Sequence, residues 1–447
     1  MKRLFGTDGI RGVAGEYPLD PSTVRQFGVA LGEALRESGK GDAGVLLGRD
    51  TRESGTWIRD AVAAGLRTHD ITVRDAGVIS TPGLAWGIRR GSYDAGVMIS
   101  ASHNPFLDNG LKVFGGSGFK LSDKLEAEIE RKILDHGCDD PGEDVVPVEN
   151  DPGTTGPYTE WLQALLAGGR FAGLKLVLDC ANGSAAAIAP QVFRHYGAEV
   201  HTLGTEPDGK NINLDCGSLH LDTLGETVKS RGADLGLAFD GDADRCLAVD
   251  ARGRTIDGDM ILYLIARSLK RRDQLPGNAV VATIMSNYWL EDTLGKEGMT
   301  LERTAVGDKY VLERMLENQV ALGGEQSGHV IAREHATTGD GILTAVMLVD
   351  TLLDEPETTV EILDRIQPYP QLLKNVRVRE KPDLRMHPVI GPVVQEVESA
   401  LEGQGRVVLR YSGTEPVARV MVEGRDSGLV SRQVDVLVTL IERELGA

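Results

Sequence analysis

The chain has 447 residues, a length that exceeds one hydrophobic core and suggests about three or four domains. Its apolar content of 41% and charged content of 26% are those of an ordinary globular protein, and no apolar run is long enough to cross a bilayer. The net charge of −19 argues against a nucleic-acid-binding protein, which needs a basic face, but it is compatible with a small anionic substrate whose site gathers basic residues.

The cysteines and the amino-terminal sequence both bear on the compartment. The sequence contains no Cys-x-x-Cys pair among its four cysteines, Cys138, Cys180, Cys216 and Cys246. This spacing favours unpaired thiols in a reducing environment. Residues 1–6 lack the apolar core and the cleavage site of a signal peptide. We therefore expect a cytoplasmic protein that binds neither a membrane nor a nucleic acid.

A unit of strand, polar loop, helix and strand is predicted three times along the chain, and each unit leads to one further apolar strand. The predicted strands are residues 45–48, 71–73, 96–99, 174–178, 198–200, 235–239, 280–284, 299–301 and 320–323. The predicted helices are residues 56–66, residues 188–196 and a third that ends near residue 294. Alternating strands and helices build mainly parallel sheets that are covered by helices.

Segments rich in proline, glycine and polar residues predict the domain boundaries, at residues 139–156, 252–259 and 366–370. We expect four domains: residues 1–150, 151–254, 255–367 and 368–447. The last has a different pattern, with strands at residues 375–379, 407–411 and 418–422 and helices at residues 389–401 and 429–445. The predicted fold class is α/β, with three related α/β domains of mixed, mainly parallel sheets and a smaller C-terminal α+β domain.

The apolar strand at residues 96–99 ends in a polar segment that contains Ser100, Ser102, His103 and Pro105. The proline prevents helix continuation, so the strand must end in a rigid loop. Ligands in open α/β sheets bind at the carboxyl ends of such strands. A serine beside an imidazole there is a candidate nucleophile or phosphate carrier. The alternative is that both serines only satisfy backbone groups of the loop.

Three carboxylates alternate along the chain directly after another apolar strand, at Asp240, Asp242 and Asp244. In a loop they can surround one hard cation such as Mg²⁺ or Ca²⁺. An EF-hand is excluded, because its glycine position holds Arg245 and its glutamate position holds Ala251. A solvated acidic turn is the alternative, but clustered carboxylates repel one another unless a cation neutralises them.

A third strand leads to a loop that combines Glu325, Gln326, Ser327 and His329. An acid, an amide, a hydroxyl and an imidazole are the groups needed to bind several sugar hydroxyls. An ordinary polar loop with a solvent-facing histidine is equally compatible with this pattern. Residues 304–309 form another polar loop after a strand.

Two further segments have the composition of anion sites. Residues 410–416, with Arg419 nearby, form a predicted hairpin whose hydroxyls, backbone N–H groups and guanidinium groups can hold a phosphate. It is not a Walker loop, and an edge hairpin with solubilising arginines is the alternative. Residues 6–12 place three glycines around Asp8 and Arg11, which allows close backbone approach beside a fixed cation.

Together, these loops resemble the motifs of the α-D-phosphohexomutase family, and most of all those of its bacterial glucosamine branch. The motifs occur in the family's order and cover essentially the whole chain: residues 6–12, 100–105, 240–245, 324–329 and 410–414. The resemblance implies three related α/β domains and a smaller fourth one around a central cleft, which agrees with the predicted repeat.

The resemblance also implies roles for single residues. Ser102 is similar to the serine that is phosphorylated in the active enzyme, and its phosphate oxygen would join Asp240, Asp242 and Asp244 around one Mg²⁺ per chain. Lys112 corresponds to a proposed acid/base residue. The implied catalytic residues are Ser102, Lys112, Arg11, Arg245 and His329. The implied substrate-binding residues are Thr304, Gly307, Asp308, Glu325, Ser327, His329, Arg410, Ser412, Gly413, Thr414 and Arg419. One departure is Ala243, where many relatives have a glycine that tolerates positive φ.

The implied activity is an isomerase that interconverts glucosamine 6-phosphate and glucosamine 1-phosphate through phosphorylated Ser102 and a sugar 1,6-bisphosphate, for cell-wall amino-sugar nucleotide synthesis. Phosphorylation of Ser102 is required for it. We expect nearby cations to lower the pKa of Lys112 so that it accepts a hydroxyl proton. The intermediate must turn around, which suits a fourth domain that moves on a hinge at Pro368 and Pro370. The family suggests a homodimer. The alternatives are a phosphomannomutase/phosphoglucomutase, a metal-dependent sugar phosphatase or a non-catalytic sugar-phosphate binder.

Overall fold

A computed structural model describes residues 4–6, 8–38, 44–136, 148–151, 153–401, 403–412 and 416–447. The chain divides into two compact units, Met1–Thr283 with Thr304–Val360, and Ile284–Arg303 with Glu361–Ala447. Several positions named above lie outside the described residues: Cys138, Gly413, Thr414, and residues 139–147 and 152 of the predicted boundary at residues 139–156.

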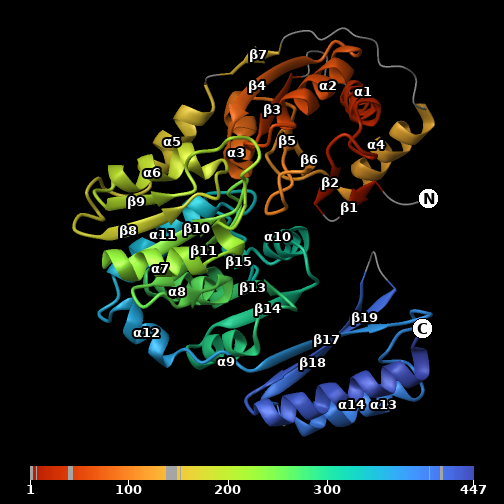
Figure 1. Cartoon of the computed structure of the whole chain (residues 1–447), viewed down its shortest axis with the longest axis vertical. Helices are drawn as coiled ribbons and strands as arrows, with labels where there is room; N and C mark the ends of the chain where they lie inside the picture. The colour runs from red at the N-terminus through yellow and green to blue at the C-terminus, as the bar shows by residue number, and fades with distance from the viewer. Residues whose placement is uncertain are drawn as a thin grey trace. The chain divides into compact units, whose positions relative to one another are not determined.

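The first part of the first unit contains a seven-stranded mixed sheet (Figure 1). Its elements are β1 (Phe5–Gly6), β2 (Gly9–Val13), α1 (Pro21–Glu37), β3 (Gly44–Arg49), α2 (Gly55–Arg67), β4 (Thr72–Val78), α3 (Thr81–Gly91), β5 (Ala95–Ile99), β6 (Asp108–Gly115), α4 (Asp123–His136) and β7 (Glu149–Asn150). The strand order is β1-β2-β6-β5-β3-β4-β7. Strands β5, β3, β4 and β7 are parallel, whereas β6 runs antiparallel to β5 and β2 antiparallel to β6.

Helices cover both faces of this sheet. Successive strand residues point to opposite faces, so Leu47 of β3 packs with Phe27 of α1, whereas Leu46 packs with Leu84 of α3. Strands that are buried on both faces are apolar throughout. This explains why β5 has the uninterrupted run that ends at Ile99, just before the serine loop.

The second α/β part repeats the arrangement with a five-stranded sheet. Its elements are α5 (Thr155–Gln163), β8 (Lys175–Asp179), α6 (Ala185–His195), β9 (Glu199–Leu203), α7 (Asp222–Arg231), β10 (Leu235–Phe239), β11 (Cys246–Asp250) and β12 (Thr255–Ile256). The order is β12-β11-β10-β8-β9, with β10, β8 and β9 parallel. Because Phe239 of β10 pairs with Cys246 of the antiparallel β11, residues 240–245 form the turn between these strands.

In the third α/β part of the first unit, a parallel strand is again followed by an antiparallel neighbour. Its elements are α8 (Gly258–Arg271), β13 (Ala279–Thr283), α10 (Asp308–Glu317), β15 (Leu322–Gly324), β16 (Val330–Ala332) and α11 (Gly341–Leu353). β15 is parallel to β13 and antiparallel to β16, with Gly324 opposite Val330. The three loops singled out by sequence therefore occupy equivalent places, each between a central strand and the antiparallel strand that follows it. The sequence analysis did not identify β6, β11 or β16.

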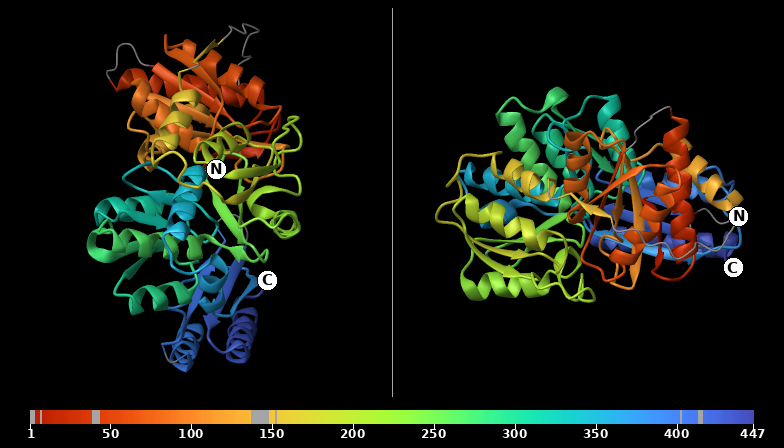
Figure 2. Two further views of the ribbon diagram at one scale, coloured as in Figure 1. Left: turned by 90° about the vertical axis from the view of Figure 1, so that its left-hand side faces the viewer. Right: turned by 90° about the horizontal axis from the view of Figure 1, so that it is seen from above.

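The second unit contains the C-terminal α+β fold. The elements of this unit are α9 (Tyr288–Lys296), β17 (Gln371–Arg377), α13 (Ile390–Ala400), β18 (Gly405–Tyr411), β19 (Val417–Gly424) and α14 (Ser427–Leu445). Two further elements, β14 (Thr300–Thr304) and α12 (Thr359–Arg365), have residues in both units. The antiparallel sheet has the order β17-β19-β18, and α13 and α14 pack on one face of it (Figure 2, blue). The predicted fold class is confirmed. None of the helices in the described ranges is long and apolar enough to cross a membrane.

Candidate active site

Ser102 lies in the loop between β5 and β6, and its side chain points to the aspartate loop. The residue is 1% exposed and has a left-handed φ of 54°. Its N–H donates to Ser100 Oγ at 2.9 Å, and that hydroxyl donates to Asp50 Oδ2 at 2.7 Å. The Ser102 hydroxyl donates to Asp240 Oδ2 at 2.5 Å. Two loops that are far apart in the sequence thus meet at this hydroxyl.

His103 also approaches the serine, with Nδ1 3.3 Å from Ser102 Oγ. Burial lowers the pKa of His103 to about 4, and the guanidinium groups of Arg245 and Arg11 act in the same direction. The imidazole is therefore neutral at pH 7.

Asp240, Asp242 and Asp244 form a compact cluster in the turn between β10 and β11. One carboxylate oxygen from each lies within 4.8 Å of the others, and all three side chains are buried. In the described part of the chain, Asp242 Oδ1 and Asp244 Oδ1 have no hydrogen-bond partner. Buried, unpaired carboxylate oxygens at this spacing fit a hard cation such as Mg²⁺. Ala243 has a φ of 55°, which confirms that the turn needs the left-handed conformation at this position.

The pKa shifts within the cluster also indicate that a cation would stabilise the three carboxylates. Burial, followed by the charges of Asp244 and Asp242, raises the pKa of Asp240 well above its usual value. Burial also raises the pKa of Asp244, but Lys112, His329 and Arg245 together outweigh this effect, and the pKa is about 2. The protein thus supplies part of the neutralisation itself.

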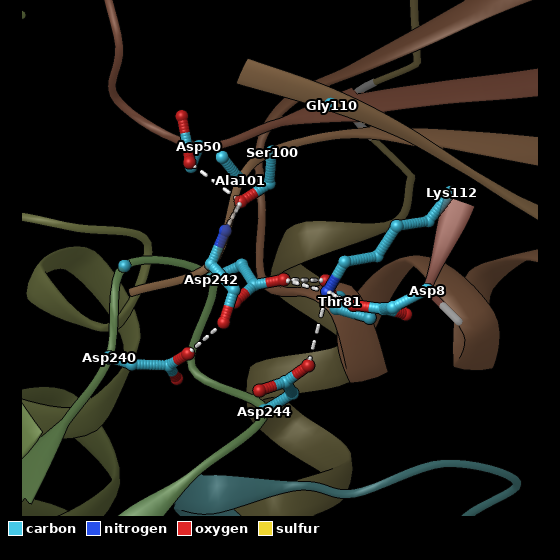
Figure 3. Close-up of polar contacts among 12 residues, drawn as sticks. Asp8, Asp50, Thr81, Ser100, Ala101, Gly110, Lys112, Asp240, Asp242 and Asp244 are labelled. Carbon is cyan, nitrogen blue, oxygen red and sulfur yellow. Dashed lines mark hydrogen bonds and ion pairs between the residues drawn. The ribbon is translucent and has the colours of Figure 1, made fainter. Parts of the chain in front are cut away.

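Lys112 of β6 provides that charge (Figure 3). Its ammonium group donates to Asp242 Oδ2 at 2.8 Å and to Asp244 Oδ2 at 3.2 Å, and it lies 3.1 Å from Asp8 Oδ2. Burial lowers the pKa of this lysine, but the three carboxylates raise it well above the usual value. This direction is opposite to the expected lowering of the Lys112 pKa, because the nearest charged groups of the protein are carboxylates rather than cations.

Backbone contacts join the aspartate turn to the other two loops. At Gly241, an added Cβ would lie 2.6 Å from the Ser102 carbonyl oxygen, so the absence of a side chain permits the close approach. On the other side, the Cys246 N–H donates to the Gly328 carbonyl at 3.0 Å. The aspartate turn is consequently held between the serine loop and the loop between β15 and β16 (residues 325–329), called the sugar-type loop below.

A pocket of about 420 Å³ opens beside these loops, within the range of about 300–1,000 Å³ that is typical of small-molecule sites. The residues that line it are Leu4, Gly6, Asp8, Gly9, Arg11, Asp244, Arg245, Val306, Gly307, Asp308, Glu325 and His329. Seven of the predicted site residues meet here, from three separate α/β parts. Thr304 and Ser327 are described by the structure but are not among the lining residues.

The predicted sugar-binding residues in the pocket hold one another in place. Glu325 Oε1 accepts a hydrogen bond from the Gly307 N–H at 3.2 Å. His329 Nε2 accepts one from the Gly339 N–H at 3.2 Å and lies 3.6 Å from Asp308 Oδ2. These contacts leave Glu325 Oε2 and His329 Nδ1 for other partners, and Nδ1 has none among the described residues.

Sequence reasoning missed two residues of the site. Lys120 forms an ion pair with Asp308 at 2.5 Å and another with Asp8, and so connects the first and third α/β parts beside the pocket. Thr81, at the start of α3, donates its hydroxyl to Asp242 Oδ2 at 2.5 Å. Neither residue belongs to a recognisable motif. Only the fold brings them to the site.

Arg410 and Arg419 of the predicted phosphate-binding hairpin, called the phosphate cradle below, lie in the second unit. Arg410 of β18 pairs with Arg419 of β19 across the sheet, and burial followed by the charge of Arg419 lowers the pKa of Arg410. Arg419 Nε is buried and has no hydrogen-bond partner in the described ranges. Lys381, which sequence reasoning missed, donates to the Ser412 carbonyl at 2.7 Å. Two adjacent guanidinium groups, one of which has a buried Nε without a hydrogen-bond partner in the described ranges, suit an anion.

Family models match all four parts of the chain. They are the models of phosphoglucomutase/phosphomannomutase alpha/beta/alpha domains I, II and III and of the C-terminal domain, at residues 2–137, 158–253, 257–369 and 373–440 respectively. The chain belongs to the phosphoglucomutase/phosphomannomutase family, the α-D-phosphohexomutases, and the predicted resemblance is confirmed.

The relatives of the chain are similar over their full length. A phosphoglucosamine mutase from Solibacter usitatus is 48% identical over 446 residues, covering 100% of this chain and 99% of the relative. A phosphoglucomutase/phosphomannomutase family protein from Burkholderia thailandensis has a similar structure, with a TM-score of 0.80, 22% identity and 99% of both chains covered. Aspergillus fumigatus N-acetylphosphoglucosamine mutase, solved with GlcNAc-6P and magnesium, gives a TM-score of 0.67 at 18% identity, covering 98% of this chain and 96% of that one.

Proposed function

We propose that this chain is an isomerase that interconverts glucosamine 6-phosphate and glucosamine 1-phosphate. The observation that carries the reaction type is the Ser102 hydroxyl, which donates to a buried aspartate cluster beside a sugar-sized pocket. The choice of the amino sugar rests on the full-length relatives named phosphoglucosamine mutase.

Ser102 is proposed to carry the phosphoryl group that is exchanged. In the first half-reaction, a free sugar hydroxyl attacks the phosphorus, the bond from phosphorus to Ser102 Oγ breaks, and a bond to the sugar oxygen forms. The hydroxyl proton passes to a base, the departing Ser102 Oγ takes up a proton from an acid, and the product is a sugar 1,6-bisphosphate. In the second half-reaction, Ser102 Oγ gives up its proton and attacks the other phosphorus, and the bond from that phosphorus to the sugar oxygen breaks. The sugar oxygen takes up a proton, so the serine ends phosphorylated as it began. Such transfers depend on positioning and charge neutralisation.

Asp240, Asp242 and Asp244 are the proposed ligands of one Mg²⁺ per chain. Their buried, unpaired oxygens fit such an ion, and magnesium is present in the structure of the Aspergillus relative. When bound, the ion supplies positive charge that stabilises the transferring phosphoryl group. Arg11 and Arg245, which line the pocket, are proposed to add fixed positive charge there.

Lys112 is the proposed group for the proton exchanged in each half-reaction. Its carboxylate neighbours favour the ammonium form, so it would first donate a proton to the departing Ser102 Oγ. His329, which lines the pocket, is proposed to assist, because its Nδ1 has no partner among the described residues.

The remaining predicted residues are assigned to substrate recognition. Glu325, Ser327 and His329 are proposed to bind sugar hydroxyls or the amine, with Thr304, Gly307 and Asp308 beside them. Arg410, Ser412, Gly413, Thr414 and Arg419 are proposed to hold the phosphate that does not react. We retain the domain division at residues 150, 254 and 367, the hinge at Pro368 and Pro370, the cytoplasmic location and the homodimer as predictions.

Turnover on three 6-phosphates, those of glucosamine, glucose and mannose, tests the proposal together with intact-mass analysis. We expect one phosphate on a fraction of the purified protein, its loss in Ser102→Ala, and the highest kcat/KM for glucosamine 6-phosphate. A preference for mannose or glucose would overturn the substrate. Steady release of inorganic phosphate would instead indicate a phosphatase, and substantial isomerisation by Ser102→Ala would remove the serine from the mechanism.

A further inference from the structure

Arg52 lies in the turn after β3, and all five N–H donors of its guanidinium are used. The side chain is fully buried, and its Nε donates to Asp50 Oδ2 at 2.8 Å. The other four donors reach three backbone carbonyls of the serine loop, those of Ser102 at 2.9 Å, Asn104 at 2.9 Å and Pro105, and the carbonyl of Asp108, the first residue of β6, at 3.0 Å. No residue of the predicted site has this relation to the serine.

The loop needs such a partner because residues 102–105 lie outside the paired register of β5 and β6, so the sheet does not bond their carbonyls. A buried carbonyl without a donor is unfavourable. Ser102 itself has a left-handed φ of 54°, a conformation that persists only where the surroundings enforce it. By binding three loop carbonyls and the first carbonyl of β6 at once, Arg52 can hold the shape of the loop that directs the hydroxyl to Asp240.

Both sides of Ser102 are connected to one buried ion pair. Its carbonyl accepts from Arg52, and its N–H donates to Ser100 Oγ, which in turn donates to Asp50 Oδ2. Asp50 Oδ2 also accepts from Arg52 Nε. The two peptide groups that flank the Ser102 side chain are therefore set by Asp50 and Arg52 together.

The same turn also contacts the second α/β part, which supplies the aspartate cluster. Thr51 Oγ1 donates to the Asn182 carbonyl at 2.6 Å, and the Glu53 N–H donates to the Gly209 carbonyl at 3.0 Å. From that part, Asn213 Nδ2 donates to the same Ser102 and Asn104 carbonyls as Arg52, at 2.9 and 3.0 Å. Arg52 thus connects the position of the serine to the part that carries Asp240.

We propose that Arg52 is a positioning residue for phosphoryl transfer, which holds the Ser102 loop in register with the aspartate cluster. The inference rests on the proposed role of Ser102 as phosphate carrier. The planar fork of five donors is specific to arginine, because a lysine ammonium has three donors on one atom. Lysine at position 52 keeps the charge beside Asp50 but leaves loop carbonyls without donors.

The test compares Arg52→Lys and Arg52→Ala with Arg59→Lys. Arg59 of α2 forms ion pairs with Asp75 and Asp60 in the same α/β part and, among the described residues, bonds to none of the serine loop, so it is a matched control. Single-turnover transfer from phosphorylated Ser102 to glucosamine 6-phosphate is measured, together with KM and Mg²⁺ binding. We expect transfer to fall about 100-fold in Arg52→Lys, the loss that a misplacement of roughly 1 Å causes, with KM changed little.

Chemical rescue separates positioning from folding. Added guanidinium ion is expected to restore part of the transfer rate in Arg52→Ala and to leave Arg59→Lys unchanged. If the Arg52 variants fail to fold, Asn213→Ala serves instead, because it removes donors from the same two carbonyls without breaking a buried ion pair. It is expected to slow transfer by a smaller factor.

Folded Arg52→Lys protein with wild-type transfer would overturn the inference, as would unchanged transfer in Asn213→Ala where it is used. A raised KM together with weaker Mg²⁺ binding, in parallel with slower transfer, would also overturn it, since that pattern indicates general damage to the fold. Failure of the proposed function looks different, because the wild-type protein would then carry no phosphate on Ser102 or would not isomerise the sugar.

Discussion

The Asp340→Asn substitution is expected to stabilise the protein at neutral and alkaline pH. Asp340 is buried at the start of α11, where Oδ1 accepts from the Leu343 N–H at 2.9 Å and Oδ2 accepts from the Tyr158 hydroxyl at 2.8 Å. Burial raises its pKa from 3.8 to about 6. An asparagine keeps the N-cap through its amide oxygen, and its NH₂ group can donate to the Tyr158 oxygen.

The size of the effect follows from the two pKa values. Their difference corresponds to about 3 kcal/mol, because each pKa unit represents about 1.4 kcal/mol. The raised pKa means that the ionised carboxylate destabilises the folded state fully above pH 6. This destabilisation declines as the pH falls from about 6 to 3.8, since the folded protein then takes up a proton before the unfolded chain does. At pH 5, about 1.6 kcal/mol of it remains.

Denaturant unfolding at pH 8, pH 5 and pH 4 is the assay. We expect the free energy of unfolding of Asp340→Asn to exceed that of the wild type by about 3 kcal/mol at pH 8, by about half as much at pH 5, and by only about 0.6 kcal/mol at pH 4. Asp426→Asn, at the exposed N-cap of α14, controls for the exchange at a helix start. A gain that is equal at all three pH values would refute the reasoning, as would a loss at pH 8.

The other predictions concern the site. Asp242→Asn is expected to fold normally but to weaken Mg²⁺ binding in calorimetry and to slow turnover by several kcal/mol of barrier; full activity in excess chelator would exclude the metal assignment. Arg419→Ala is expected to raise KM by the equivalent of about 1.5–3 kcal/mol, the range for a charge-assisted hydrogen bond, while intact mass still shows phosphate on Ser102; loss of that phosphate as the main defect would exclude the cradle. Glu325→Gln is expected to reduce kcat/KM for glucosamine 6-phosphate more than for glucose 6-phosphate, because a carboxylate favours a protonated amine by roughly 1 kcal/mol over a neutral hydroxyl; an equal loss on both sugars would refute that role.

Local sequence patterns were sufficient to predict the loops that meet at the site. Asp240, Asp242 and Asp244 were recognised because an apolar strand ends directly before them, and the cluster lies within 4.8 Å as the spacing suggests. The serine loop and the sugar-type loop were recognised in the same way. In each case the transition from a buried strand to a polar turn is encoded within about ten neighbouring residues, so no knowledge of the fold was required.

The electrostatic state of these residues was not predictable in that way. Lys112 was expected to have a lowered pKa, and the structure reverses the direction because Asp8, Asp242 and Asp244 surround its ammonium group. The two acids of the aspartate turn lie more than a hundred residues from the lysine in the chain. A pKa depends on the charges within a few ångströms, and those are set by packing.

The sequence by itself determined the fold class, the order of the site loops and the chemical type of each. Only the tertiary structure decided which side chains support them, such as Arg52 beneath the serine, Lys120 between Asp8 and Asp308, and Thr81 beside Asp242. The physical reason is one of range. Strand ends and turns depend on the polarity and backbone preferences of adjacent residues, whereas a buried guanidinium or ammonium acquires its role from carbonyls and carboxylates that distant segments bring to it.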